Sequence, residues 1–184
     1  FKNGDVVMEA RNITAWIKAG KEGKPAWCYY NFDSINGLIY GKLYNWYAIN
    51  DTRGLSPVGW RIPNYEDWAK LTKYLGGEVI ASTKLKSKEG WKEPTFLEKR
   101  KIIQNYEIFN SESGNGTDEV GFNGLPGGFC DNKGISKYLN YTSYWWTSTE
   151  GTNFSLWYSS SYYVNVWCLK KLKSFGYYVR YIKD

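Results

Sequence analysis

The side chains that could carry chemistry are three cysteines and scattered carboxylates, because the sequence contains no histidine. Catalysis by Ser-His-Asp or Cys-His groups is excluded, since both need a histidine base. Cys28, Cys130 and Cys168 lie far apart and show no CxxC spacing, which makes a zinc site a weak hypothesis. A Cys130–Cys168 disulfide is one expectation, because both residues fall in expected strands, and three buried or inert thiols are the alternative.

Two carboxylates converging in one cleft could hydrolyse a glycosidic bond, and the sequence does not fix where its acidic residues lie. The available ones are Glu66, Asp67, Glu93, Asp118, Glu119 and Glu150. Glu66 and Asp67 are better explained as negative charges at the start of a helix. We therefore expect no catalytic residues, and we expect that the protein is not an enzyme.

The loop sequence SGNGTDE could supply oxygen ligands to calcium from Asn115, Asp118 and Glu119. Their spacing does not match an EF-hand, and a solvated acidic turn is the favoured explanation. The glycine-rich stretch GGFCDNKG lacks the GK[ST] ending of a phosphate-binding loop, so its glycines indicate turns. We expect neither a bound metal nor a cofactor.

The formal charge of +6 suits an acidic partner such as an acidic polysaccharide. No nucleic-acid-binding motif accompanies the charge, so we expect no nucleic acid partner. Candidate ligand contacts combine a cluster of lysines with aromatic residues that could stack on sugar rings: Lys84, Lys86, Lys88, Trp91, Lys92, Trp157 and Tyr158. The alternative is a plain solvated surface for the lysines and core packing for the aromatic residues, which make up 19% of the chain.

The clearest structural instructions lie in residues 55–77, LSPVGWRIPNYEDWAKLTKYLGG. Asn64 is placed to cap a helix, and Asp67 completes a capping-box pattern. The apolar residues that follow repeat with the period of a helix and predict one buried face: Trp68, Leu71, Thr72 and Leu75. This stretch therefore predicts a short amphipathic helix that must lie on a sheet.

The rest of the chain predicts one earlier helix and a late group of strands. The helix begins near Ile13, and Gly20 and Gly23 end it. Asn36-Gly37 indicates a turn. Residues 78–120 predict a long surface excursion with a short helical piece near 97–103. Strands are expected at 144–149, 161–169 and 176–182, and short turns would join them into an antiparallel meander. We expect a single α+β domain over residues 1–184, with the helices on one side of a twisted antiparallel sheet.

Several stretches together resemble the Fibrobacter succinogenes major paralogous domain family, in the right order over nearly the whole chain. They are PAWCYYN, YGKLYNWYA, RGLSPVGWRIPNYEDWAKLTKYLGG, GFNGLPGGF, YWWTSTE and GYYVRYIKD. The resemblance implies a fold related to the C-type-lectin-like and formylglycine-generating-enzyme-like folds, with two short helices, a twisted antiparallel sheet and a long loop region at 78–120. The chain departs from the family at Tyr181, where members commonly have Cys, and it lacks the W-x-x-x-NL strand that usually precedes FKNGD.

The family occurs on secreted and cell-surface proteins of Bacteroidota and Fibrobacteres, often lipoproteins of the outer membrane. The resemblance implies a module that binds a glycan or a protein in adhesion or surface assembly. It also implies that the module is non-catalytic, since the close-spaced copper-binding cysteines of the related enzymes are missing. The alternative is a structural subunit of a surface complex that binds a protein partner and no small ligand. Contact with a membrane is expected only through an anchor or partner outside this sequence. Asp33-Ser34-Ile35 matches an O-glycosylation pattern of such bacteria, with Ser34 as the acceptor.

Overall fold

The computed structural model describes residues 1–93, 114–149, 155–160, 167–170 and 172–184, with only the backbone described for 155–160 and 167–170. The described helices are short, and one of them is a single 3-10 turn. They are α1 (Ile13–Glu22), the 3-10 turn η1 (Tyr30–Phe32), α2 (Ser34–Tyr40), α3 (Trp46–Ile49), α4 (Tyr65–Tyr74) and α5 (Glu78–Leu85).

The strands are also short, and they form several small sheets. They are β1 (Met8–Glu9), β2 (Ala26–Cys28), β3 (Leu43–Tyr44), β4 (Trp60–Arg61), β5 (Phe129–Cys130), β6 (Ser136–Lys137), β7 (Thr142–Trp146), β8 (Ser155–Ser160), β9 (Trp167–Lys170) and β10 (Ile182–Lys183). The larger sheets have the orders β1-β2-β3 and β7-β8-β9, and the pairs β10-β4 and β5-β6 complete the described set. The protein is a mixed α+β domain with short helices and small sheets, which confirms the expected class.

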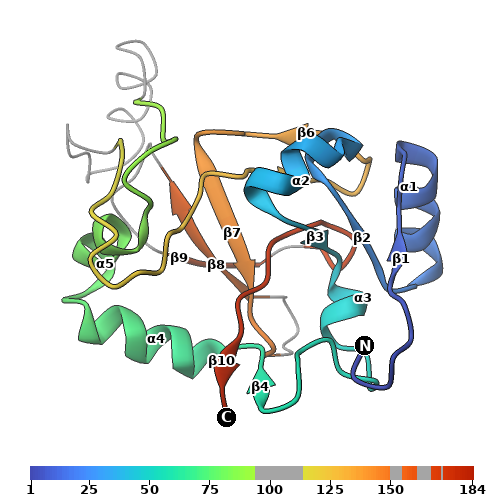
Figure 1. Cartoon of the computed structure of the whole chain (residues 1–184), viewed down its shortest axis with the longest axis horizontal. Helices are drawn as coiled ribbons and strands as arrows, with labels where there is room; N and C mark the ends of the chain where they lie inside the picture. The colour runs from blue at the N-terminus through green and yellow to red at the C-terminus, as the bar shows by residue number, and fades with distance from the viewer. Residues whose placement is uncertain (94–113, 150–154, 161–166, 171) are drawn as a thin grey trace.

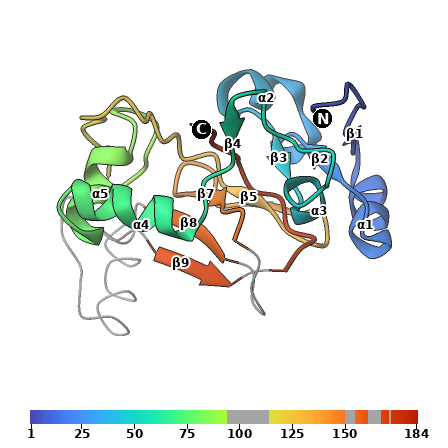
Figure 2. The same cartoon turned by 90° about the horizontal axis from the view of Figure 1, so that it is seen from below.

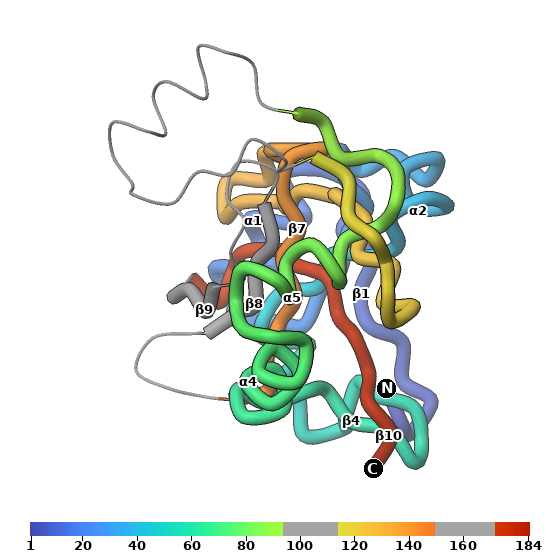
Figure 3. The backbone as a smooth tube through the Cα atoms, turned by 90° about the vertical axis from the view of Figure 1, so that its left-hand side faces the viewer, coloured from blue at the N-terminus to red at the C-terminus, as the bar shows by residue number. Residues whose placement is uncertain are grey.

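The C-terminal segment joins the separate sheets. Tyr177 forms an antiparallel bridge with Tyr44 of β3, Tyr178 forms a parallel bridge with Trp145 of β7, and Gly176 bridges Cys130 of β5. Figure 1 shows this segment, in red, crossing β7 on its way to β10, and Figure 3 shows both termini at the same end of the molecule. One extended segment therefore holds the N-terminal sheet against the meander.

The capped helix predicted from residues 55–77 is confirmed as α4. The Asn64 side chain accepts a hydrogen bond from the Asp67 N–H at 2.9 Å, and the Asp67 carboxylate accepts one from the Asn64 N–H at 2.8 Å. Asp67 also pairs with Arg61, which lowers the pKa of its carboxyl group. Trp68 and Thr72 are buried on the inner face, where α4 packs beside β8 (Figure 2).

The earlier helix is also confirmed, including its end at Gly23. Asn12 caps α1 by accepting a hydrogen bond from the Ala15 N–H, and Gly23 ends it in the left-handed conformation with a φ of 65°. Gly20 does not end the helix. It lies inside α1 at a close approach, where an added Cβ would come within 2.9 Å of the Ser174 Cβ.

Two local predictions are wrong. Asn36-Gly37 does not form a turn but lies within α2, where glycine is required because a Cβ at position 37 would come within 2.2 Å of the Tyr29 ring. Residues 78–85 do not begin a surface excursion but form α5, whose Ala81, Ser82 and Leu85 are buried. Two helices were expected, and the described part of the chain holds five α-helices. The helical piece expected near 97–103 lies outside the described residues.

The predicted meander is present with different strands. β7 corresponds to the strand expected at 144–149, and β8 and β9 follow it with antiparallel pairing. Of the strand expected at 161–169, only 167–169 falls within the described residues, inside β9. The closing strand is split, since residues 177 and 178 form bridges while only Ile182–Lys183 pairs regularly with β4.

The core is built from large aromatic side chains. Trp46, Trp146 and Tyr177 are at most 1% exposed and meet edge to face, with the Trp146 ring 5.3 Å from that of Trp46 and 4.8 Å from that of Tyr177. A second cluster, which includes Trp68, Trp145 and Cys130, joins buried residues of α1, β2, β3, α4, α5, β5 and β7. These clusters fix the positions of the segments that line the cavity described below.

The expected Cys130–Cys168 disulfide is contradicted, because Cys130 is a free thiol in the structure. Its sulfur is fully buried, where Cys28 forms a hydrogen bond with it, and burial raises the pKa of the Cys28 thiol. The Cys168 side chain lies outside the described residues.

In a Cys168→Ser background we expect Cys28 and Cys130 to resist a thiol reagent such as DTNB in the native protein at pH 7.5. Both should react within the mixing time after unfolding in guanidinium chloride. A titration before and after unfolding measures this, and single Cys28→Ser and Cys130→Ser variants assign each thiol. Rapid reaction of the native protein, or fewer than two thiols in the unfolded protein without reductant, would contradict the buried dithiol.

Candidate functional site

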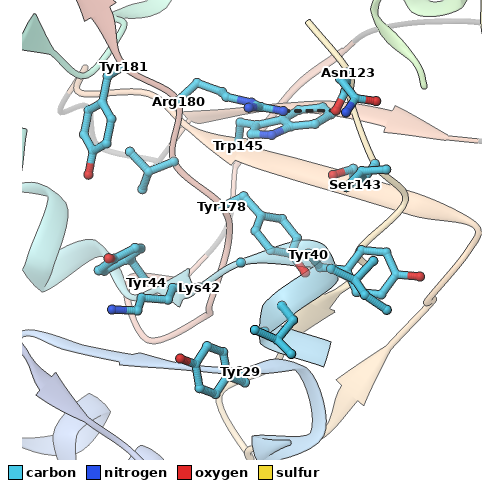
Figure 4. Close-up of a pocket in the computed structure, with 16 residues that line it drawn as sticks. Tyr29, Tyr40, Lys42, Tyr44, Asn123, Ser143, Trp145, Tyr178, Arg180 and Tyr181 are labelled. Carbon is cyan, nitrogen blue, oxygen red and sulfur yellow. Dashed lines mark hydrogen bonds between the residues drawn. The ribbon is translucent and has the colours of Figure 1, made fainter. Parts of the chain in front are cut away.

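A cavity of about 570 Å³ opens where α2, β3, β7 and the C-terminal segment meet. Figure 4 shows it in close-up, with tyrosine side chains from several elements around it. Its lining consists of Tyr29, Gly37, Leu38, Ile39, Tyr40, Gly41, Lys42, Tyr44, Asn123, Leu125, Ser143, Trp145, Tyr178, Val179, Arg180 and Tyr181. We call this cavity the tyrosine groove.

The wall formed by α2 is positioned by local sequence. Gly37 leaves room for the Tyr29 ring, and Gly41 ends α2 with a φ of 82°, which favours glycine and turns the chain toward β3. The Tyr40 hydroxyl donates a hydrogen bond to the Asn140 side chain at 3.1 Å. The Lys42 ammonium group lies 4.0 Å from the centre of the Trp27 ring, which holds an otherwise flexible side chain at the rim.

The opposite wall belongs to β7 and the C-terminal segment. The Tyr178 hydroxyl donates to the Gly127 carbonyl at 2.8 Å, so this tyrosine is a structural member of the lining. Trp145 packs against Phe122 with ring centres 5.2 Å apart. The Arg180 guanidinium donates to the carbonyl oxygens of Phe122 and Asn123 at 3.0 and 3.1 Å. These contacts hold the wall in one arrangement before any ligand arrives.

Ser143 contributes a hydroxyl group that the fold does not use. The residue is only 1% exposed, and its buried Oγ has no hydrogen-bond partner in the described part of the chain. An unsatisfied buried hydroxyl costs about 1–3 kcal/mol, so a native protein usually pairs it. The side chain lies at the edge of the groove in Figure 4. Because its Oγ is closed off from the surface, a ligand hydroxyl or carbonyl can pair with it only if the lining opens beside it.

The charged residues that the structure describes in the lining are both positive. Among the described residues of the lining, Lys42 and Arg180 are the charged ones, and none is a carboxylate or a thiol. Burial raises the pKa of Tyr44, with smaller contributions from Tyr181 and Tyr29, and burial also raises the pKa values of Tyr40 and Tyr181. These hydroxyls therefore stay protonated at neutral pH as neutral donors and acceptors. The described lining can therefore bind and orient a polar ligand.

The predicted ligand contacts do not form this groove. Lys86 and Trp91 are 2% and 4% exposed, so they are core residues and cannot contact a ligand at the surface. The Trp91 indole N–H donates hydrogen bonds to the Ser87 Oγ and the Gly124 carbonyl. Lys84 pairs with Glu119 at 3.0 Å.

The other predicted contacts lie elsewhere or beyond the described side chains. Lys88 and Lys92 are exposed, and the Lys92 ammonium group lies 5.8 Å from the centre of the Tyr141 ring. Trp157 and Tyr158 lie on β8, whose side chains are outside the described set. Lys88 and Lys92 are not part of the described lining of the tyrosine groove.

The suggested calcium ligands have structural roles instead. The Asn115 side-chain oxygen accepts from the Trp91 N–H at 2.9 Å, and an Asp118 carboxylate oxygen accepts from the Asn123 N–H at 2.6 Å. Glu119 is paired with Lys84. Within the described residues, no group of three or more cysteine and acidic side chains could hold a metal ion.

Ser34 is exposed at the first turn of α2, next to the capping Asp33. Whether it carries a glycan stays a prediction, and the position is at least accessible to a transferase. No helix in the described part of the chain has the length and apolar content to cross a membrane.

Comparison with known proteins gives one match. The model of the Fibrobacter succinogenes major domain family matches residues 1–183. No curated protein and no solved structure matches the chain.

Proposed function

The chain belongs to the Fibrobacter succinogenes major domain family, and we propose that it is a non-catalytic module that binds a glycan in the tyrosine groove. The observation that carries this proposal is a preformed cavity lined by tyrosine rings, with the Ser143 hydroxyl buried in its wall and without a partner among the described residues. Aromatic faces suit the apolar faces of sugar rings, and fixed hydroxyl and amide groups suit sugar hydroxyls. The part of the lining that the structure describes carries no carboxylate pair, which supports binding without hydrolysis.

We also propose a C-type-lectin-like arrangement and a place on secreted or cell-surface proteins, outer-membrane lipoproteins among them. The capped helix α4 and the C-terminal segment that closes the core support the first part of this proposal. Fractionation of the native organism tests the second. Recovery of the protein in the cytoplasmic fraction alone would overturn it.

The glycan proposal is tested by the variant Ser143→Ala. Screening on a glycan array first identifies a bound oligosaccharide, and titration calorimetry then gives its affinity. Removing a hydroxyl that lacks a partner should leave thermal stability unchanged or slightly higher, while the affinity falls about fivefold from the loss of one hydrogen bond. Loss of affinity without loss of stability is a signature that a purely structural residue would not give.

Thr142→Val is the matched control, because the Thr142 hydroxyl is also buried without a partner within the described residues but does not line the groove. It should leave the affinity unchanged. Equal effects of the two substitutions, or no oligosaccharide bound on the array, would overturn the proposed role of the groove.

A second candidate function is attachment to a protein partner through α2. Ile35, Leu38 and Ile39 are 67%, 89% and 55% exposed and share one face of this short helix. An exposed apolar face of this kind is typical of an interaction surface. Ile35 lies outside the groove lining, so Ile35→Glu should reduce recovery of a co-purified partner from native membranes without changing glycan affinity. Val58→Glu is the control, since Val58 is 85% exposed elsewhere.

A further inference from the structure

Arg180 has a position that the proposed function does not yet explain. It lies in the lining of the tyrosine groove and also in that of a neighbouring cavity of about 430 Å³ next to α4. It is the one charged residue of the closing segment GYYVRY, which otherwise packs against the core. The groove therefore has a cation at a boundary that two cavities share.

The guanidinium of Arg180 differs from those of the other described arginines in its partners. Those arginines each form an ion pair with a carboxylate: Arg11 with Glu9, Arg53 with Asp51, and Arg61 with Asp67. Within the described residues, no carboxylate lies within 4.0 Å of Arg180. Carbonyl oxygens are its only described acceptors, although an acidic partner would have stabilised a partly buried charge much better.

The hydrogen bonds of Arg180 orient the guanidinium and leave donors free. Its two hydrogen bonds within the described residues, to the carbonyl oxygens of Phe122 and Asn123, both come from the same nitrogen, Nη2. The guanidinium carbon lies 4.7 Å from the centre of the Phe122 ring, which fixes its plane. Nη1 and Nε have no acceptor within the described residues. A fixed guanidinium with free donors matches the geometry of a carboxylate.

The surroundings strengthen an electrostatic attraction to an anion. Burial lowers the pKa of Arg180, and the more distant Asp118 acts in the opposite direction, but a guanidinium remains charged throughout the neutral range. Because the group is partly withdrawn from water, its field is screened less than that of an exposed arginine. Lys42 lies across the groove in Figure 4 and adds a second positive charge.

We propose that Arg180 is the carboxylate-binding group of the tyrosine groove and that the ligand is an oligosaccharide containing uronic acid. This inference rests on the proposed glycan function and adds the charge class of the sugar. The tyrosine rings and the Ser143 hydroxyl contact the neutral part of the sugar, and Arg180 with Lys42 binds the acidic part. An acidic peptide is the competing ligand, and the experiment distinguishes it.

The test compares two forms of one sugar chain. Oligogalacturonate carries carboxylates, and its methyl ester has the same rings and linkages without the charge. We expect the protein to bind the acid form about tenfold more tightly than the ester at low salt, and to lose most of this preference near 1 M salt. Calorimetric titration of the full chain with each form measures the ratio.

Three variants assign the preference to Arg180. Arg180→Gln keeps a donor for the carbonyl oxygens but removes the charge, so the ratio of acid to ester affinity should fall to near one. Arg180→Lys keeps the charge and should retain part of the preference. Arg11→Gln removes an exposed arginine outside the groove and should leave the ratio unchanged. Thermal unfolding of each variant confirms that it is folded.

The outcomes separate this inference from the function on which it rests. Equal binding of acid and ester would overturn the carboxylate role and leave the glycan function standing. A preference that survives in Arg180→Gln would show that Arg180 does not bind the carboxylate. A parallel loss of both affinities would show that Arg180 only holds the loop at 122–123. Binding of neither form would overturn the inference, and binding of an acidic peptide instead would overturn the glycan function as well.

Discussion

Replacing Lys86 with methionine is expected to stabilise the protein by about 2–4 kcal/mol at pH 6 and to lose this advantage by pH 10. Lys86 is 2% exposed, and burial lowers the pKa of its ammonium group from 10.5 to about 7. Such a change corresponds to roughly 3–5 kcal/mol at about 1.4 kcal/mol for each pH unit. We expect less than this because methionine loses the contact with the Gly114 carbonyl at 3.4 Å and with the Trp91 ring at 5.0 Å.

The sign follows from the protons bound in each state. Below pH 7 Lys86 is charged in both the folded and the unfolded chain, so the full cost of burying the charge is present. Between pH 7 and 10.5 the unfolded chain holds the proton that the folded protein has released, and stability rises with pH. Above 10.5 the group is neutral in both states. The wild-type protein should therefore gain stability across this window relative to the methionine variant.

Urea unfolding of both proteins at pH 6, 8 and 10 measures the difference directly, and other titrating groups cancel in the comparison. Lys88→Met is the matched control, because Lys88 is exposed two residues further along. It should change stability by less than about 0.5 kcal/mol at every pH. A difference between wild type and Lys86→Met that stays constant from pH 6 to 10 would contradict a buried ammonium group.

Lys86 also shows where the sequence is misleading. Lys84, Lys86 and Lys88 alternate in a charged stretch, and that pattern is typical of a solvated surface or a ligand contact. The chain folds back on this stretch from far along the sequence, since the Ser87 N–H donates to the Gly124 carbonyl and the Gly116 N–H to that of Ser87. Burial of Lys86 is a consequence of these long-range contacts, which local composition cannot report.

The features that could be predicted are those that neighbouring residues determine. The capping box of α4 depends on residues three positions apart, and the stripe around Trp68 depends on helical period, so both were predicted correctly. Asn36-Gly37 was mistaken for a turn because the same dipeptide is a strong hairpin signal. Its glycine is explained only by the Tyr29 ring, whose approach is tertiary.

The tyrosine groove could not be predicted for the same reason. Its described lining comes from five separate stretches of the chain, and the bridges of Tyr177 and Tyr178 hold the C-terminal one against β3 and β7. One signal was available, namely Arg180 as an isolated charge inside an aromatic closing strand. A charge in such a place needs a partner, and identifying that partner requires knowledge of which segments lie beside it.

Replacing Trp146 with alanine is expected to have the largest effect of any single substitution in the core, a loss of about 4–6 kcal/mol. Trp146 is fully buried between Trp46 and Tyr177. Its indole N–H donates to the Tyr44 carbonyl at 2.7 Å, and that carbonyl also accepts from the Tyr177 N–H at 3.0 Å. Alanine would leave a cavity at the point where β3, β7 and the C-terminal segment meet.

Because domains of this size are stable by only about 5–15 kcal/mol, Trp146→Ala should be largely unfolded or aggregated near 37 °C. Trp146→Phe separates packing from hydrogen bonding. It keeps most of the ring, and the Tyr44 carbonyl keeps one donor, so the expected loss is about 1–2 kcal/mol with the fold intact. Trp60→Ala is the control for removing a tryptophan, since Trp60 is 41% exposed, and it should cost less than about 1.5 kcal/mol.

Thermal and urea unfolding of the three variants measure these losses of stability. The expected order is Trp146→Ala largest, with Trp146→Phe and Trp60→Ala both smaller. The Tyr44 and Tyr178 side chains line the groove, and Trp146 contacts the backbone of both, since its own N–H donates to the Tyr178 carbonyl at 3.0 Å. Trp146→Phe should therefore stay folded but bind a groove ligand more weakly than wild type. If Trp146→Ala were no less stable than Trp60→Ala, this tryptophan would not be the junction that holds the groove walls together.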